Sequence, residues 1–129
     1  WDASKAWEDF ADMENECLQE LFKDGQQRVL SVGWRTIFAE QNRGLIASTE
    51  NLVRFYLEIS LAEQLRRASK LSPWELENRP ALQWDIKSFF TNMQWDRAPI
   101  YKDFAGGNII PVDKRSNPDI IKSIITRLH

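Results

Sequence analysis

The stretch from Ser48 to Lys70, STENLVRFYLEISLAEQLRRASK, decides the predicted fold. On a helical wheel its first half is apolar over more than half of the circumference, and only Arg54 and Glu58 leave a narrow polar wedge. A helix that is apolar over so wide an arc has to be buried on several sides. We therefore predict that residues 48–70 form a central helix around which other helices pack.

Length and composition predict one intracellular domain. The 129 residues are enough for a single hydrophobic core, and no run approaches the roughly 20 apolar residues of a spanning helix. Cys17 is the only cysteine, which excludes an intrachain disulfide and favours a reducing compartment. We predict a cytoplasmic rather than a nuclear location. Because the chain opens with Trp instead of Met, we expect a domain excised from a larger protein or a processed chain.

The charge is unevenly spread along the chain. The first 25 residues carry eight acidic and two basic side chains, while the whole chain has a net charge of −2. The remainder is mildly basic but contains no run of Lys or Arg, so we do not expect a nucleic-acid partner. The acidic N-terminal helix is either solvated or faces a basic partner.

The central helix is predicted to have helical neighbours on both sides. Asp2 can cap an amphipathic helix over residues 3–23, and a second helical pattern follows over residues 26–41, with a kink or break at Gly33. Beyond the central helix we expect three more helices, which start at the capping box of Ser72 and Glu75, near Pro80, and at Asn117. Residues 97–117 contain two prolines and the triplet Gly106-Gly107-Asn108, and are expected to be irregular.

The predicted fold is therefore all-α. We expect a compact bundle of five to seven helices around the buried helix at about 48–70, with an irregular Pro/Gly segment before the C-terminal helix. Residues 1–129 are expected to form this single domain.

Catalytic constellations are not recognisable in the sequence. The glycine pair at 106–107 lacks the Lys-Ser/Thr of a phosphate-binding loop, and no Asp/Glu cluster has metal-loop spacing. His129 is the only histidine, so the usual general base and most metal sites are missing. Glu14 is the one unusual carboxylate, because it falls within the apolar stripe of its helix. It either lies at a groove edge or pairs with a neighbouring helix, or it is a partly buried acid of raised pKa. We predict no catalytic residue, no metal site and no cofactor.

Tryptophan is the notable residue type, with six in the chain. Trp7 and Trp34 are expected to fill gaps between helices, but Trp84 and Trp95 fall away from the core stripe of their predicted helix. They either pack under the 97–117 segment or form an exposed binding patch, which Arg97 and Tyr101 would extend. We predict these four residues as the partner-binding site.

The start of the central stretch resembles the RGS family of helical regulators of heterotrimeric G proteins. The resemblance is carried by Glu50-Asn51-Leu52, the pair Phe55-Tyr56, and the preceding Trp34 and Phe38. One extra residue separates Leu52 from the aromatic pair, which departs from the family pattern. The resemblance implies that Asn51 contacts the GTPase.

We conclude from the sequence that the chain is a non-enzymatic protein–protein interaction module, an adaptor in signalling or trafficking whose partner is another protein. The first alternative is an RGS-like regulator of a GTPase. The second is an enzyme with an unrecognised carboxylate site at Glu14.

Overall fold

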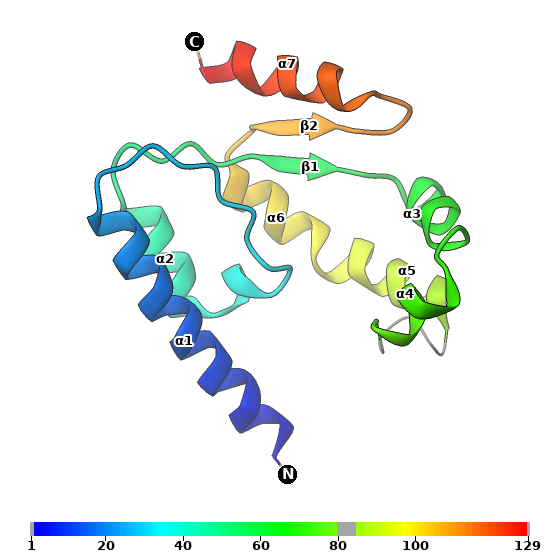
Figure 1. Ribbon diagram of the computed structural model, residues 1–129, viewed down its shortest axis with the longest axis horizontal. Coiled ribbons are helices and arrows are strands. Elements are labelled where there is room, and N and C mark those ends of the chain that lie inside the picture. Colours follow the sequence, from blue (N-terminus) through cyan, green and yellow to red (C-terminus); the bar gives the residue numbers. More distant parts are fainter. Residues whose placement is uncertain (1, 80–84, 129) are drawn as a thin grey trace. The chain divides into compact units, whose positions relative to one another are not determined.

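The computed structural model describes residues 2–79 and 85–128 and divides the chain into two compact units, Trp1–Leu52 and Val53–His129 (Figure 1). The prediction that residues 1–129 form one domain stays a prediction.

The first unit begins with helix α1 (Ala3–Lys23), which confirms the predicted N-terminal helix. Its start is set by Asp2, whose Oδ1 accepts a hydrogen bond from the backbone N–H of Ser4 at 2.9 Å. Leu18 is buried, whereas Cys17 is exposed. The local cap and the amphipathic period agree here, and such agreement makes a helix predictable from sequence.

The helix predicted over residues 26–41 is wrong over most of its length. Residues 26–33 contain no helix, and they are followed by a short 3-10 helix, η1 (Thr36–Phe38), and by α2 (Glu40–Ser48). Val29 is fully exposed in the extended segment. The β-branched residues Val29 and Val32, together with Gly33, have low helix propensity, and the exposed side chains of the two valines gain little burial that would override it.

The carboxylate of Glu14 joins α1 to η1. Thr36, which is 2% exposed, donates a hydrogen bond from its hydroxyl to Glu14 Oε2 at 2.6 Å. Gln41 Nε2 makes a second link, to Asp12 Oδ1 at 2.7 Å. Glu14 therefore has a hydroxyl partner from a neighbouring element, which explains a carboxylate inside the apolar stripe without any catalytic role.

The second unit begins where the central helix was predicted, and that prediction is wrong. Residues 48–70 divide into the end of α2, strand β1 (Tyr56–Glu58) and helix α3 (Leu61–Ala68). The apolar run around β1 is that of a strand in a parallel sheet, where both faces are covered and hydrophobic residues are nearly continuous. A short run of this kind has no period that distinguishes a buried strand from a buried helix.

Helices α4 (Pro73–Glu77) and α5 (Ile86–Asp96) follow. The predicted capping box is confirmed: the Ser72 hydroxyl accepts from the N–H of Glu75, and the Glu75 carboxylate accepts from the N–H of Ser72. The start predicted near Pro80 lies outside the described residues.

The segment 97–117 is not irregular, which corrects a third expectation. It contains helix α6 (Ala98–Ala105) and strand β2 (Ile109–Pro111), and the final helix α7 (Asn117–Leu128) follows as predicted. Pro99 lies in the first turn of α6, where its missing N–H costs nothing, and Gly106 ends the helix at φ +60°.

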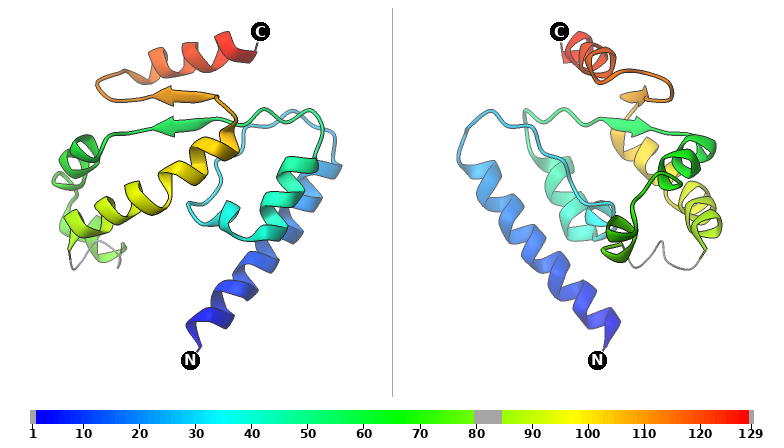
Figure 2. Two further views of the ribbon diagram at one scale, coloured as in Figure 1. Left: turned by 180° about the vertical axis from the view of Figure 1, so that it is seen from behind. Right: turned by 45° about the vertical axis from the view of Figure 1, so that its right-hand side comes forward.

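The two strands form a parallel sheet, with Tyr56 opposite Ile109 and Leu57 opposite Ile110. Helix α6 lies beside β1 and α7 beside β2, on opposite sides of the strand pair (Figures 1 and 2). Ile110 is fully buried, and Val112 and Ala105 are nearly so. The all-α prediction is therefore wrong, because β1 is joined to a parallel partner through helices, as in α/β proteins.

Among the described residues, no helix is long and apolar enough to cross a membrane.

Helix α3 makes a pH-dependent contribution to the stability of the second unit. Glu63 accepts hydrogen bonds from Arg66 Nε at 2.7 Å and from Arg67 Nε at 3.0 Å, and these bonds lower the pKa of its carboxyl from 4.5 to about 2. Because the folded-state pKa is depressed, the stabilisation is fully present above pH 4.5 and is lost as the pH falls through about 2.

We expect a carboxyl NMR titration to give Glu63 a midpoint near 2, and Glu63→Gln to flatten the acid limb of the stability profile. A midpoint near the ordinary 4.5 would show that the two arginines do not hold this carboxylate in solution.

Candidate functional site

The side chains of the two parallel strands point alternately to the two faces of the sheet. Tyr56 and Glu58 point toward α6, where the Tyr56 ring lies 5.5 Å from that of Tyr101 and Glu58 pairs with Lys102 at 2.6 Å. Ile110 instead points toward α7. In open α/β sheets, ligands bind beyond the carboxyl ends of the parallel strands. A binding site is therefore expected beyond the carboxyl ends of β1 and β2.

Arg97 is placed at this edge by the junction of two helices. Arg97 is both the C-cap residue of α5 and the N-cap residue of α6. Its carbonyl accepts a hydrogen bond from the backbone N–H of Tyr101 at 3.1 Å. The α5–α6 junction lies toward the carboxyl end of β1 (Figure 1). The side chain is half-buried, and its Nη1 atom is buried. A guanidinium is thus held at a helix N-terminus, where the helix dipole also favours an anion.

We name the five residues at this place the junction cluster: Tyr56, Glu58, Arg97, Tyr101 and Lys102. Burial raises the pKa of the Tyr56 phenol, with a smaller contribution from Glu58, and burial likewise raises the pKa of Tyr101 against the effect of Arg97. The hydrogen bond to Glu58 raises the pKa of Lys102. At neutral pH the cluster therefore offers two neutral hydroxyl groups and the half-buried guanidinium of Arg97, while the Lys102 charge is matched by Glu58.

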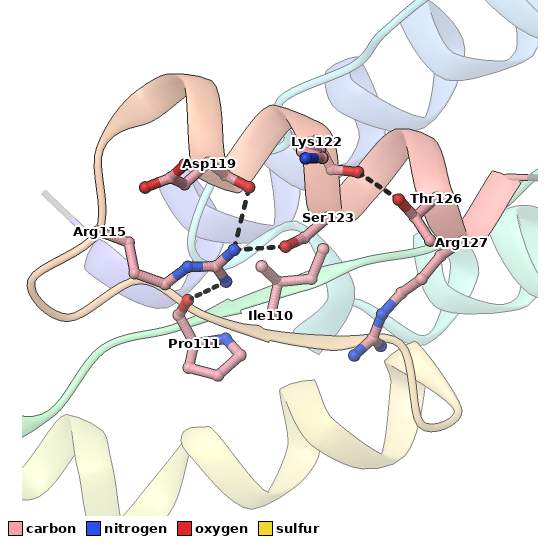
Figure 3. A pocket seen from close by; sticks show the side chains of 8 residues that line it. All are labelled: Ile110, Pro111, Arg115, Asp119, Lys122, Ser123, Thr126 and Arg127. Carbon is pink, nitrogen blue, oxygen red and sulfur yellow. Dashed lines mark hydrogen bonds between the residues drawn. The ribbon is translucent and has the colours of Figure 1, made fainter.

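A second feature is a hollow of about 370 Å³ between β2 and α7 (Figure 3). The guanidinium of Arg115 donates to the carbonyls of Pro111 at 2.9 Å and Asp119 at 3.0 Å, and also to the Ser123 hydroxyl. These bonds hold the loop after β2 against α7. Three cations and one carboxylate line the hollow, together with apolar and hydroxyl side chains: Ile110, Pro111, Arg115, Asp119, Lys122, Ser123, Thr126 and Arg127.

The structure describes three of the four residues predicted as the binding site, which stays a prediction. Arg97 and Tyr101 belong to the junction cluster, Trp95 is 80% exposed on α5, and Trp84 lies outside the described residues. The sequence prediction missed Tyr56, Glu58 and Lys102, because the first two were assigned to a helix and the third to an irregular segment. No local signal in the sequence could have found the first two, because a short apolar run has no period that distinguishes a strand from a buried helix.

The loop before β1 differs from what the RGS resemblance implies. Asn51 adopts a left-handed conformation, φ +62°, in the loop before β1, and does not begin a helix as the RGS resemblance implies. Residues 2–79 and 85–128 contain no group of three His, Cys, Asp or Glu side chains that could hold a metal ion. The 129-residue sequence also contains no Gly-x-x-x-x-Gly-Lys-Ser/Thr motif.

The strands, their helical connection and the site at their carboxyl edge define an α/β protein. The shikimate kinase family model matches residues 3–129. The chain belongs to the shikimate kinase family.

Curated relatives agree with this assignment. Shikimate kinases of Francisella tularensis subsp. holarctica (strain FTNF002-00 / FTA) and subsp. novicida (strain U112) are each 29% identical over 122 residues, and that of Francisella philomiragia subsp. philomiragia is 27% identical. Each match covers 94% of this chain and 62% of the relative. The chain thus spans less than two thirds of the length of the curated relatives it matches. No solved structure matches the chain.

Family membership corrects the functional predictions. The chain is similar to kinases, so the prediction of a non-enzymatic adaptor in signalling or trafficking is wrong, as is the RGS-like alternative. The alternative enzyme site at Glu14 gains no support, because that carboxylate is bound by Thr36 in the first unit. The α/β fold expected of a kinase agrees with the parallel sheet and not with a helical bundle.

Proposed function

We propose that this chain works as part of a shikimate kinase and binds shikimate at the junction cluster, for transfer of a phosphoryl group from a nucleoside triphosphate to a shikimate hydroxyl. The observation that carries the proposal is the family match over residues 3–129, together with the half-buried Arg97 at the N-terminus of α6. We also propose that this enzyme works in the cytoplasm, where nucleoside triphosphates are available.

The chemistry of shikimate fits the junction cluster. Shikimate is a carboxylate whose ring carries hydroxyl groups, so a binding site needs one cation and several neutral hydrogen-bonding groups. Arg97 supplies a planar guanidinium that can bind a carboxylate through two parallel hydrogen bonds. The phenols of Tyr56 and Tyr101, kept neutral by their raised pKa values, can donate to or accept from hydroxyl groups.

The triphosphate requires groups that these 129 residues do not supply. Kinases with a phosphate loop bind the β- and γ-phosphates through loop N–H groups and a lysine, and hold Mg²⁺ through the Ser or Thr of the same loop. That motif is not in the sequence, so we derive no step through Mg²⁺. In our proposal the loop comes from the part of a shikimate kinase that lies beyond the matched 62%.

We expect the 129-residue chain to bind shikimate and to prefer it at least about tenfold over cyclohexanecarboxylate, which has the carboxylate but no hydroxyl groups. Calorimetric titration of both compounds into the same protein measures the preference. Equal binding would show that only a charge is being recognised. No binding of shikimate to a folded chain would overturn the proposed substrate site.

A further inference from the structure

Helix α3 ends in a serine that follows two arginines, in the sequence Arg66-Arg67-Ala68-Ser69. Ser69 is the only serine or threonine of the 129-residue sequence with basic side chains both two and three positions before it. Protein kinases select their substrates by charge pattern, and one class of them selects arginine at these two positions. The sequence therefore marks Ser69 as a candidate for phosphorylation.

The structure leaves this serine open to an enzyme. Ser69 is the C-cap residue of α3 and is exposed, as are Arg66 and Arg67. Its hydroxyl donates a hydrogen bond to the backbone carbonyl of Arg66 at 2.6 Å, so it is held by the last helical turn and by no packed side chain. A kinase binds its substrate as an extended segment. Because α3 has only eight residues and its last turn is exposed, that turn can open at low cost.

The charges around Ser69 favour a phosphate on its hydroxyl. Arg66, Arg67 and Lys70 place three cations within three positions of it. The carboxylate of Glu63 accepts hydrogen bonds from both arginines. A phosphate adds a charge of about −1.5 to −2 and three acceptor oxygens. The negative end of the α3 dipole opposes this charge, so a phosphate here needs a guanidinium to bind it.

Arg66 is the arginine that is placed to bind the phosphate. It lies three positions before Ser69, which puts both side chains on one face of the helix, whereas residues two positions apart do not face each other. Without the phosphate, Arg66 donates to Glu63 from Nε at 2.7 Å and from Nη2 at 2.5 Å. Arg67 is attracted by Asp113 as well as by Glu63. A doubly charged phosphate attracts the Arg66 guanidinium more strongly than the singly charged carboxylate does.

We propose that Ser69 is a phosphorylation site for a protein kinase with an acidic substrate groove, and that the phosphate takes Arg66 from Glu63. In the transfer, the Ser69 Oγ attacks the γ-phosphorus of a nucleoside triphosphate held by that kinase. A bond from Oγ to phosphorus forms and the bond from phosphorus to the bridging oxygen breaks. The nucleoside diphosphate leaves, and the hydroxyl proton passes to the catalytic aspartate of the kinase. This proposal does not depend on the function proposed for the junction cluster.

The first test is phosphorylation of the whole 129-residue chain by the catalytic subunit of cyclic-AMP-dependent protein kinase with radiolabelled ATP. We expect stoichiometric labelling, which Ser69→Ala abolishes. Ser116→Ala is the matched control, because Ser116 is also exposed and follows the basic pair Lys114-Arg115, but with the pair one position too close. This control should be labelled like the parent chain. Labelling that survives Ser69→Ala would overturn the assignment of the site.

A peptide of residues 63–72 shows whether the fold permits the reaction. We expect the whole chain to be labelled at a rate within about tenfold of the peptide rate, because only the last turn of α3 has to open. A labelled peptide beside an unlabelled chain would show that α3 protects Ser69, and it would overturn the proposal. Absence of label from both would overturn it too, since the sequence itself would then not be recognised.

Two NMR titrations of the phosphorylated chain test the change of partner. The pKa of the Glu63 carboxyl should rise above about 2, because the hydrogen bonds from Arg66 are lost. The phosphate titration midpoint should fall below its ordinary value of about 6, because a bound guanidinium favours the dianion. A Glu63 midpoint that stays near 2 would reject the change of partner. A rise for Glu63 without a fall for the phosphate would also reject it, because the phosphate would then repel Glu63 without binding Arg66.

Discussion

Replacing Ile110 by alanine is expected to lower the free energy of unfolding of the second unit by about 3 kcal/mol. Ile110 is the central residue of β2 and is fully buried. Its side chain lines the hollow between β2 and α7 (Figure 3). Truncation removes three carbon atoms from a sheet of only two strands. Because few other residues of this unit are so deeply buried, the neighbouring side chains have little means of refilling the space.

The comparison that isolates this effect is Leu57→Ala, because Leu57 is the register partner of Ile110 and is 48% exposed. It has the same kind of side chain on the same face of the sheet but loses far less burial. Urea unfolding followed by far-UV circular dichroism should separate the two variants by about 2 kcal/mol. If the two substitutions cost the same, Ile110 is not the core residue of this unit.

Replacing Arg97 by alanine is expected to weaken shikimate binding about 10- to 100-fold, the loss that follows from removing a hydrogen-bonded charge worth about 1.5–3 kcal/mol. The expectation depends on the position of Arg97 at the start of α6, beside two half-buried phenols. Arg97→Lys keeps the charge but loses the planar pair of donors, so it should recover only part of the affinity.

Two controls separate binding from folding in this experiment. Urea unfolding of each variant shows whether the half-buried Arg97 also supports the structure. Lys122→Gln removes an exposed cation from the hollow at α7, so it tests whether any loss of positive charge is sufficient. If Lys122→Gln weakens shikimate as much as Arg97→Ala does, binding is electrostatic and diffuse, and the junction cluster is not the site.

The predictions that held concern helix ends, and each depends on residues close together in the chain. The Asp2 cap, the box of Ser72 and Glu75, and the start of α7 at Asn117 involve groups within three or four positions of one another. Their hydrogen bonds form whatever the remainder of the chain does. The α6 helix could have been predicted in the same way, because proline is common in the first turn of a helix and glycine just after its end, as Pro99 and Gly106 are here.

The prediction that failed most widely is the central helix. Nothing local identifies Tyr56–Glu58 as a strand, because its partner, Ile109–Pro111, lies about 50 residues later and only their pairing distinguishes a strand from a buried helix. The junction cluster could not be predicted from the sequence for the same reason. It joins Tyr56 and Glu58 from the strand with Arg97, Tyr101 and Lys102 from α6 and its N-cap.

The sequence by itself determined both ends of α1, the starts of α4 and α7, the acidic character of α1, and, through its similarity to relatives, the family. Only the tertiary structure decided that the apolar run after Leu52 is a strand, that Ile110 is the core, and that Arg97 stands at the carboxyl edge of a parallel sheet. The physical reason is the range of the interactions. Caps and helical faces are satisfied within one or two turns, whereas a strand and a binding site exist only once distant segments have paired.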